Sequence, residues 1–404
     1  MTAFFAALFL SAGYNTAVVS IGAALLGASA GFVGTYVLLR KRSLVSDAIS
    51  HATLPGLVIA FMGAASLTGQ GRSTVALMVG AAASAAVGLL AVDWMTRRTR
   101  LTEDAAIGAV LSVFFGLGVV LMTVVQTLQT GGQAGLASYL LGSTAGMLRS
   151  EAEVIALAGA IAAVVVLLLK RRFTLVCFDE EYAAALGLDI RRSDLAMMAL
   201  VLAITVIGLR IAGLVLIVAL MIIPPVAARF WTDRSERMVL IAAGVGAGSA
   251  YVGAALSSVG PGLPTGAVIV LVAFTLFILS LLMSPVRGLL AVALRRRAFH
   301  VAVHRRQGLL EMTRSERILD PATLRVLRSQ GLIRADGVPT PEGREAAAAA
   351  AQDEERWELF RRLYPGETEV HSHQGVEPID HVLPSDLVAD LDRRLEKGAP
   401  EEQR

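Results

Sequence analysis

Long apolar runs fill residues 1 to about 290 of this chain, and short polar or basic loops separate them. A run of ~20 apolar residues is long enough to cross a bilayer as a helix. From Arg295 the chain turns polar, and the remaining ~100 residues suffice for one small soluble domain. The sequence therefore predicts an all-α polytopic membrane domain over residues 1–290 and a tail domain over residues 308–397.

The composition supports this class and excludes others. Of the residues, 55% are hydrophobic and 17% are charged, and the mean hydropathy is +0.65, far from a soluble average. Much of the basic excess lies in short loops, which indicates membrane topology rather than nucleic-acid binding. The single cysteine, Cys177, excludes an intramolecular disulfide and a cysteine-rich metal site. Residues 1–15 lack a charged n-region and predict a short interfacial helix rather than a signal peptide.

We expect eight or nine membrane spans. The candidate runs are 16–39, 51–67, 74–94, 104–128, 154–169, 195–229, 238–256 and 265–283. The run at 136–148 is too short to cross and predicts a re-entrant segment, whereas 195–229 is too long for one crossing. We expect 208–213 to split the latter into two crossings, with Pro224-Pro225 as a break near its end.

Basic clusters predict the orientation through the positive-inside rule. They lie at 40–42, 97–100, 170–172, 191–192, 229–237 and 295–306. The loops at 69–73, 129–135 and 257–264 carry one basic residue between them, Arg72. The two sets alternate only if 195–229 crosses twice, and the tail then lies in the cytoplasm. Small residues recur within the spans, as in GAALLGASAGFVG, and predict close helix contacts; compositional bias is the alternative.

The stretch Arg40 to Gly56 carries two metal-ligand side chains among apolar segments. Asp47 and His51 are four residues apart and share one face of a helix. A carboxylate and an imidazole together can bind a divalent transition metal, and ionisable groups at membrane depth are usually functional. Pro55-Gly56 predicts an interruption of the helix beside them. The alternative is an ordinary loop in which Asp47 caps a helix and His51 has no role.

A polar interlude, CFDEEYAAALGLDIRRSD, predicts a short helix on the cytoplasmic side. Asp179 and the two glutamates after it suit a helix N-terminus, and Gly187 suits a C-cap. An acidic start with an apolar patch can dock into a groove on a partner protein, although a solvated connector helix is the alternative. The chain has no GxxxxGK[ST] sequence, so any ATP chemistry belongs to another chain.

Three motifs resemble the permeases of metal-type ATP-binding-cassette importers, which carry zinc, manganese or iron. SDAISHATLPG resembles their SHA-x-LPG stretch, DEEYAAALGLD their coupling helix, and GLVLIVALMIIPPVAAR their GxLLVxALLxxPxxxAR element. The resemblance covers residues 15 to 290, with small departures at Ser46 and Pro225. It implies that Asp47 and His51 form the metal-pathway pair. It also implies that the following residues contact the ATPase subunit: Asp179, Glu181, Tyr182, Ala184, Leu186 and Gly187.

The tail resembles a different family, the metal-dependent iron or manganese transcriptional regulators. A helix, GLIR, a short hairpin and TPEGR are similar to their winged-helix end, so the resemblance implies a small α/β domain. By position, the regulator ligands correspond to Glu358, His373, Glu377, Asp380 and His381. Glu354 stands where that family has histidine, and the front half of the DNA-binding domain is missing. Nucleic acid is therefore not an expected partner, and a surface cluster on a degraded domain is the alternative to a metal site.

Taken together, these features predict the permease subunit of an ATP-driven importer of manganese, zinc or iron in the bacterial plasma membrane. The expected partners are an ATP-binding subunit, an extracytoplasmic metal-binding protein, a second permease copy or paralogue, and membrane lipid. The chain itself is not expected to be an enzyme or to hold a resident cofactor; a divalent metal is its substrate and a possible regulator of the tail. The alternatives are a secondary metal transporter working alone and a membrane-tethered regulator.

Overall fold

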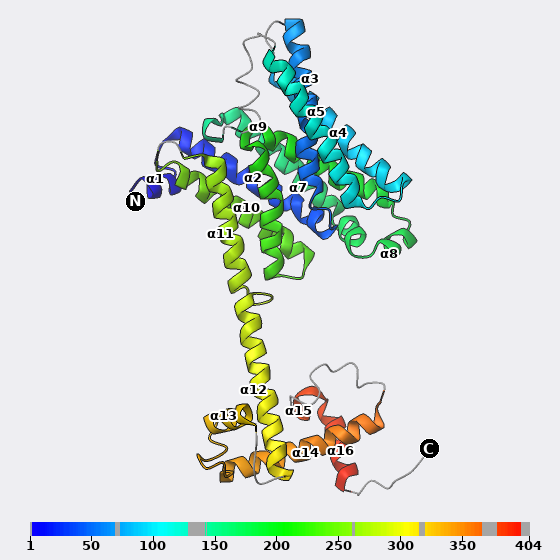
Figure 1. The fold of residues 1–404 in the computed structure, drawn as a ribbon, viewed down its shortest axis with the longest axis vertical. Helices are drawn as coiled ribbons and strands as arrows, with labels where there is room; N and C mark the ends of the chain where they lie inside the picture. The colour runs from blue at the N-terminus through cyan, green and yellow to red at the C-terminus, as the bar shows by residue number, and fades with distance from the viewer. Residues whose placement is uncertain are drawn as a thin grey trace. The chain divides into compact units, whose positions relative to one another are not determined.

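The computed structural model describes residues 2–68, 73–127, 142, 144–260, 263–314, 320–365 and 378–396. The chain divides into two compact units, unit 1 (Met1–Leu289) and unit 2 (Leu290–Arg404). The described residues of both units are almost entirely helical (Figure 1).

The described residues of unit 1 include eight helices that are long and apolar enough to cross a membrane. They are α2 (Tyr14–Leu39), α3 (Val45–Thr68), α4 (Thr74–Arg98), α5 (Glu103–Thr127), α7 (Arg149–Phe178), α9 (Ile190–Trp231), α10 (Ser235–Ser257) and α11 (Thr265–Met283). Three short helices join or precede them: α1 (Thr2–Leu8), the 3-10 helix η1 (Thr144–Gly146) and α8 (Glu180–Ala185). The predicted all-α membrane domain is confirmed; the re-entrant segment at 136–148 lies mostly outside the described residues.

Helix α9 doubles back on itself at Gly213. This residue has a φ of 77° and a ψ of 169°, a conformation that glycine adopts without a steric penalty. The hydroxyl of Thr205 then lies 3.8 Å from the sulfur of Met221, sixteen residues later, whereas a straight helix would separate them by about 24 Å. The run at 195–229 therefore forms two antiparallel segments, as predicted.

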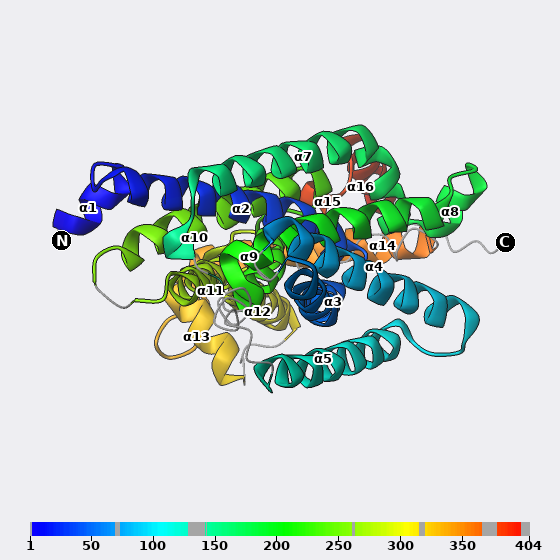
Figure 2. The same ribbon diagram turned by 90° about the horizontal axis from the view of Figure 1, so that it is seen from above.

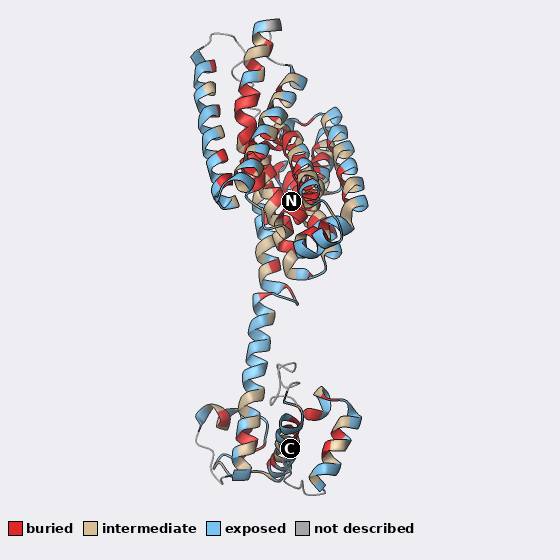
Figure 3. Ribbon diagram, turned by 90° about the vertical axis from the view of Figure 1, so that its right-hand side faces the viewer, coloured by how far each residue is buried: buried red, intermediate tan, exposed pale blue. Residues whose placement is uncertain are grey.

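The helices of unit 1 form two groups joined by α9 (Figure 2). Helix α2 packs on α7, α9 and α10, while α3 packs on α4, α5 and α9. Buried residues concentrate along α2, α3 and α9 (Figure 3). In the most apolar 18-residue stretch of the outer helices α5, α7 and α11, only 22%, 17% and 17% of the residues are buried. The exposed leucines, valines and phenylalanines of these helices suit contact with lipid.

Small residues bring the helix backbones close together, which supports the packing interpretation over compositional bias. A methyl group on Gly27 of α2 would collide with the carbonyl of Gly246 in α10, and the reverse holds for Gly246. Gly56 of α3 and Gly80 of α4 face each other in the same way. Because lipid offers no hydrophobic driving force between helices, such close approach is a main source of stability.

The predicted helix break at Pro55-Gly56 is wrong. Helix α3 continues from Val45 to Thr68 with Pro55 inside it. Pro55 cannot donate to the carbonyl of His51 one turn earlier, but the neighbouring helices hold the segment in place. A methyl group on Gly118 of α5 would touch Leu54 and Pro55, so α5 packs directly against this turn.

The predicted basic loops lie at one end of unit 1, where ion pairs connect them; we call this end the basic end. Arg42, after α2, pairs with Glu103 at the start of α5. Arg191 at the start of α9 pairs with Asp93 near the end of α4. At the opposite end, the hydroxyl of Thr144 donates to the carbonyl of Ile211 beside the α9 turn. This alternation of ends agrees with the orientation inferred from the basic clusters.

Unit 2 is built around helix α14 (Pro341–Leu363). Its other helices are α12 (Leu289–Arg314), α13 (Pro321–Ser329), α15 (Ile379–Val382) and α16 (Ser385–Glu396). One small core lies between α12, α13 and the first half of α14, around Leu309 and Leu327. A second core, around Trp357, joins the other half of α14 to α15 and α16.

The expected α/β character of the tail is not found. The hairpin after GLIR is a tight turn that closes with one isolated antiparallel bridge, Ile333 to Pro339. The N–H of Arg334 donates to the carbonyl of Val338 at 2.9 Å, and the pairing extends no further than Thr340, which caps α14. The described part of unit 2 contains no strand, so the expected α/β winged helix is not supported. The order of a helix, a turn and a second helix is present.

Candidate functional site

The predicted metal pair lies near the start of α3, at the basic end of unit 1. Nε2 of His51 lies 3.5 Å from Oδ1 of Asp47, as expected for residues one helical turn apart. Both side chains are partly exposed on a helix whose other faces are buried. One carboxylate oxygen and one imidazole nitrogen therefore face the same space, which suits transient binding of a divalent transition metal.

Phe115 of α5 packs against the ring of His51. The two rings meet edge to face, with centroids 4.9 Å apart and an interplanar angle of 83°. Nδ1 of His51 is buried and has no hydrogen-bond partner among the described residues. Only Nε2, the nitrogen near Asp47, is therefore presented to the accessible side of the pair.

The Asp47–His51 pair offers only two side-chain ligands within one chain. Within the described ranges, no group of three or more histidine, cysteine, aspartate or glutamate side chains is close enough to hold an ion. Two protein ligands are fewer than the four of a closed structural site. Any further ligands to an ion at this pair would have to come from water or from another chain.

The short helix predicted from the polar interlude is present as α8. The carboxylate of Asp179 accepts from the N–H of Tyr182 at 2.8 Å and caps its N-terminus. Gly187 ends it with a φ of 76°. Ala183 is fully buried toward the bundle, while Tyr182 and Leu186 are more than half exposed. The exposed residues Glu181 and Ala184 lie on the same short helix. An apolar outer face on an otherwise polar loop is available for docking to another protein.

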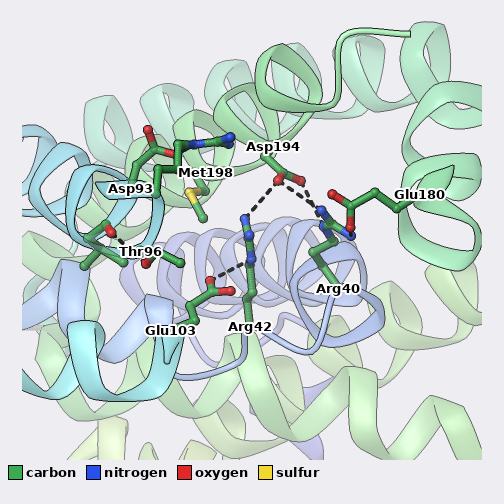
Figure 4. Close-up of a pocket in the computed structure, with 10 residues that line it drawn as sticks. Arg40, Arg42, Asp93, Thr96, Glu103, Glu180, Asp194 and Met198 are labelled. Carbon is green, nitrogen blue, oxygen red and sulfur yellow. Dashed lines mark hydrogen bonds and ion pairs between the residues drawn. The ribbon is translucent and has the colours of Figure 1, made fainter. Parts of the chain in front are cut away.

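A buried ionic cluster lies between α8 and the turn that leads into α3 (Figure 4). Arg40 donates to both carboxylate oxygens of Asp194, from Nε at 2.9 Å and from Nη2 at 3.1 Å. Arg42 reaches the same carboxylate at 3.2 Å and also pairs with Glu103. Glu180 of α8 accepts from Arg40 at 3.1 Å, which holds the pKa of that carboxyl below its usual range. A cavity of about 260 Å³ opens beside the cluster.

This cluster is not predictable from the sequence patterns. Arg40 and Arg42 have the appearance of topology signals, and Asp194 that of the end of the polar interlude. The available signal was weak: an aspartate stands directly before a long apolar run, where its side chain is buried to 96%. Its partners lie about 150 residues earlier in the chain, and a single sequence carries no information on such a pairing.

The tail residues with ligand-type side chains do not form a site in the described part of unit 2. Glu358 and His381 are exposed, and Asp380 lies 3.7 Å from the guanidinium of Arg356. His373 and Glu377 lie outside the described residues. Glu354, which replaces the expected histidine, accepts from Arg306 and Arg361. The carboxylates Glu354 and Asp380 therefore belong to arginine ion pairs.

The fold and the site define a class: a polytopic membrane protein with a partly exposed carboxylate–imidazole pair and a short helix whose outer face is apolar. Residues 14–284 match the ABC 3 transport family, and the chain belongs to that family. The chain is 38% identical over 296 residues to the manganese transport system membrane protein MntC of Bacillus subtilis, which covers 73% of this chain and 67% of that protein. It is 37% identical over 284 residues to the zinc transport system membrane protein TroC of Treponema pallidum, covering 70% and 94%.

A solved structure agrees with the fold of unit 1. PsaBC from Streptococcus pneumoniae in complex with Fab superimposes with a TM-score of 0.60 and 25% sequence identity. The match covers 70% of this chain and 97% of that chain.

Proposed function

We propose that this chain is the membrane permease of an ATP-driven importer of divalent transition-metal ions, with manganese, zinc or iron as its cargo. The Asp47–His51 pair carries the proposal, because it combines one oxygen and one nitrogen ligand at 3.5 Å on a core helix of the bundle. Relatives with about the same identity to this chain are named as manganese and zinc transport proteins. The choice among the three ions is therefore left to experiment.

The partners follow from what this chain lacks and from what it exposes. Its sequence contains no nucleotide-binding loop, so hydrolysis belongs to an ATPase subunit that docks on α8 through Tyr182 and Leu186. An extracytoplasmic metal-binding protein delivers the ion to the opposite end. A second permease copy or paralogue completes the pathway that one Asp47–His51 pair leaves open. In this arrangement the basic end and unit 2 face the cytoplasm of a bacterium.

The function is tested by uptake into vesicles that contain the permease, its ATPase and its binding protein. We expect ATP-dependent uptake of at least one of the three ions, and we expect Asp47→Ala and His51→Ala each to abolish it while the complex still assembles. Asp104→Ala is a matched control, since Asp104 is an exposed carboxylate at the same end of unit 1. Normal uptake by both pair variants would exclude the assignment.

The alternative, a secondary metal transporter, uses the same pair without an ATPase. The exposed apolar face of α8 favours the ATP-driven complex, because a carrier working alone has no need for a docking helix. Uptake by the permease alone in ATP-free vesicles would establish the alternative. Competition between manganese, zinc and iron(II) in the same vesicles identifies the cargo.

A further inference from the structure

We infer that Arg40 and Asp194 form a joint that transmits the movement of α8 to the metal-bearing helix α3. The inference rests on the proposed function, because it concerns how ATP hydrolysis at a docked partner reaches the Asp47–His51 pair. Arg40 and Asp194 touch neither metal nor nucleotide in this account; they are positioning residues.

The side chain of Arg40 clamps the chain on both sides of α8. Its Nη1 donates to the carbonyl of Val176 at 3.0 Å, in the last turn of α7. The same nitrogen donates to Glu180 within α8. Its Nε and Nη2 hold Asp194, at the start of α9, as a bidentate pair. One guanidinium therefore contacts the element before the docking helix, the docking helix itself and the element after it.

The backbone of the joint leads directly into α3. Arg40 is the C-cap of α2, and its neighbour Lys41 has a φ of 60°, which turns the chain sharply. The N–H of Arg42 donates to the carbonyl of Val37 at 2.9 Å and ties the turn back to α2. Helix α3 begins only three residues later, at Val45, and Asp47 lies in its first turn. A shift of Arg40 or Arg42 therefore reaches Asp47 through a short and tightly bonded connector.

Because Asp194 is buried, the joint favours the arrangement in which both arginines contact its carboxylate. Only 4% of its side chain is exposed, and two arginines neutralise it. A charge in such surroundings is costly when a partner leaves, so the cluster resists partial separation. The adjoining cavity, lined also by Asp93, Thr96 and Arg97, leaves room for the arginines to take a second arrangement. The link to Glu180 is more exposed and is the part that an incoming partner can alter.

The test measures metal ions transported per ATP hydrolysed in vesicles with the whole complex. We expect Asp194→Asn and Arg40→Lys to lower this ratio by about fivefold or more, the lower end of typical coupling effects. ATPase co-purification and metal binding to the complex should stay at wild-type levels. Arg40→Lys keeps the charge but loses the bidentate fork, so it should lose less coupling than Arg40→Ala.

A control variant and a replacement variant allow the result to be interpreted in every case. Glu236→Gln removes another ion pair at the basic end, with Lys170 at 3.2 Å, that contacts neither α8 nor the α3 turn; its ratio should be unchanged. If Asp194→Asn does not fold, Glu180→Gln, a half-exposed position, replaces it, with a smaller loss expected. Wild-type ratios in folded Asp194→Asn, or in Glu180→Gln where Asp194→Asn does not fold, would overturn the joint while leaving the proposed function intact. A wild-type complex without ATP-dependent uptake would overturn both.

Discussion

The candidate metal pair of unit 1 and the ligand-type residues of unit 2 partner their carboxylates in different ways. In unit 1, Asp47 faces the imidazole of His51, and among the described residues it forms no ion pair with arginine. In unit 2, Glu354 and Asp380 each lie beside an arginine guanidinium. A carboxylate held by a guanidinium already has its charge neutralised, whereas one beside an imidazole shares a metal-binding geometry. The candidate metal site can thus be distinguished from a structural ion-pair network by the side chain that faces each carboxylate. The presence of acidic residues alone does not distinguish them.

The largest effect is expected when the metal pair is turned into an ion pair of the tail type. His51→Arg places a guanidinium one turn from Asp47, where it can bind the carboxylate directly. Uptake should fall by more than about 100-fold, because loss of an outer-shell partner alone costs 10–100-fold. Initial uptake rates in vesicles measure the effect, with Asp104→Ala as control. Uptake within twofold of wild type would contradict the comparison.

A moderate effect is expected when a tail carboxylate is released from its arginine. Arg356 binds Asp392 through two nitrogens, at 2.6 and 2.8 Å, and is mostly buried. Arg356→Ala should destabilise the packing of α14 on α16 by about 1–3 kcal/mol, between the values for exposed and buried pairs. Hydrogen exchange in α16 of the full-length protein should accelerate accordingly, while uptake is unchanged. Arg362→Ala, an exposed arginine on the same helix, is the control; equal exchange in both variants would argue against a structural role.

A smaller effect is expected from the tail if it senses imported metal, a hypothesis that stays a prediction. The described candidates can be removed together in the full-length chain, as Glu358→Ala, Asp380→Ala and His381→Ala. If the tail binds metal and inhibits transport, this variant should continue uptake at high internal metal, where the wild type slows. Metal binding weaker than ~100 μM, or about 5.5 kcal/mol, together with unaltered shut-down in the variant, would leave unit 2 as a structural domain.

The smallest effect concerns pH. The Arg40 guanidinium lowers the pKa of Glu180, so the folded state holds this carboxylate ionised more strongly than the unfolded state. The resulting stabilisation is complete above the unfolded pKa of about 4.3 and is lost only as pH falls through the lower folded value. The ratio of ions to ATP should therefore not change between pH 5.5 and 7.5 through this group. A change that Glu180→Gln abolishes would show that the carboxylate titrates in this range.

Much of unit 1 could be predicted because the bilayer imposes strong local rules. Hydropathy was enough to locate the long apolar helices, and the excess length of 195–229 predicted the reversal that Gly213 makes. The helix break at Pro55 was wrong because a proline is tolerated when neighbouring helices pack around it. The close contact of Gly118 with this turn depends on tertiary packing, which local sequence does not report.

The candidate site was predictable only in its local parts. Asp47 and His51 are one turn apart in sequence, and α8 carries its own cap and stop signals, so both could be found by pattern. The Arg40–Asp194 pair joins residues that are 154 positions apart. The local sequence around one residue does not predict that it contacts the other. In unit 2, the resemblance to a regulator implied metal ligands but gave no information on the arginines nearby. Two of the carboxylates there, Glu354 and Asp380, are paired with arginines.

The central claim, that Asp47 and His51 hold the transported ion, is tested most directly by spectroscopy of the bound ion. Pulsed electron paramagnetic resonance of Mn²⁺ bound to the purified complex reports a coordinated imidazole through its ¹⁴N coupling. We expect this coupling in the wild-type complex and in Asp104→Ala, and its loss in His51→Ala. An unchanged ¹⁴N coupling in His51→Ala would show that another residue holds the ion.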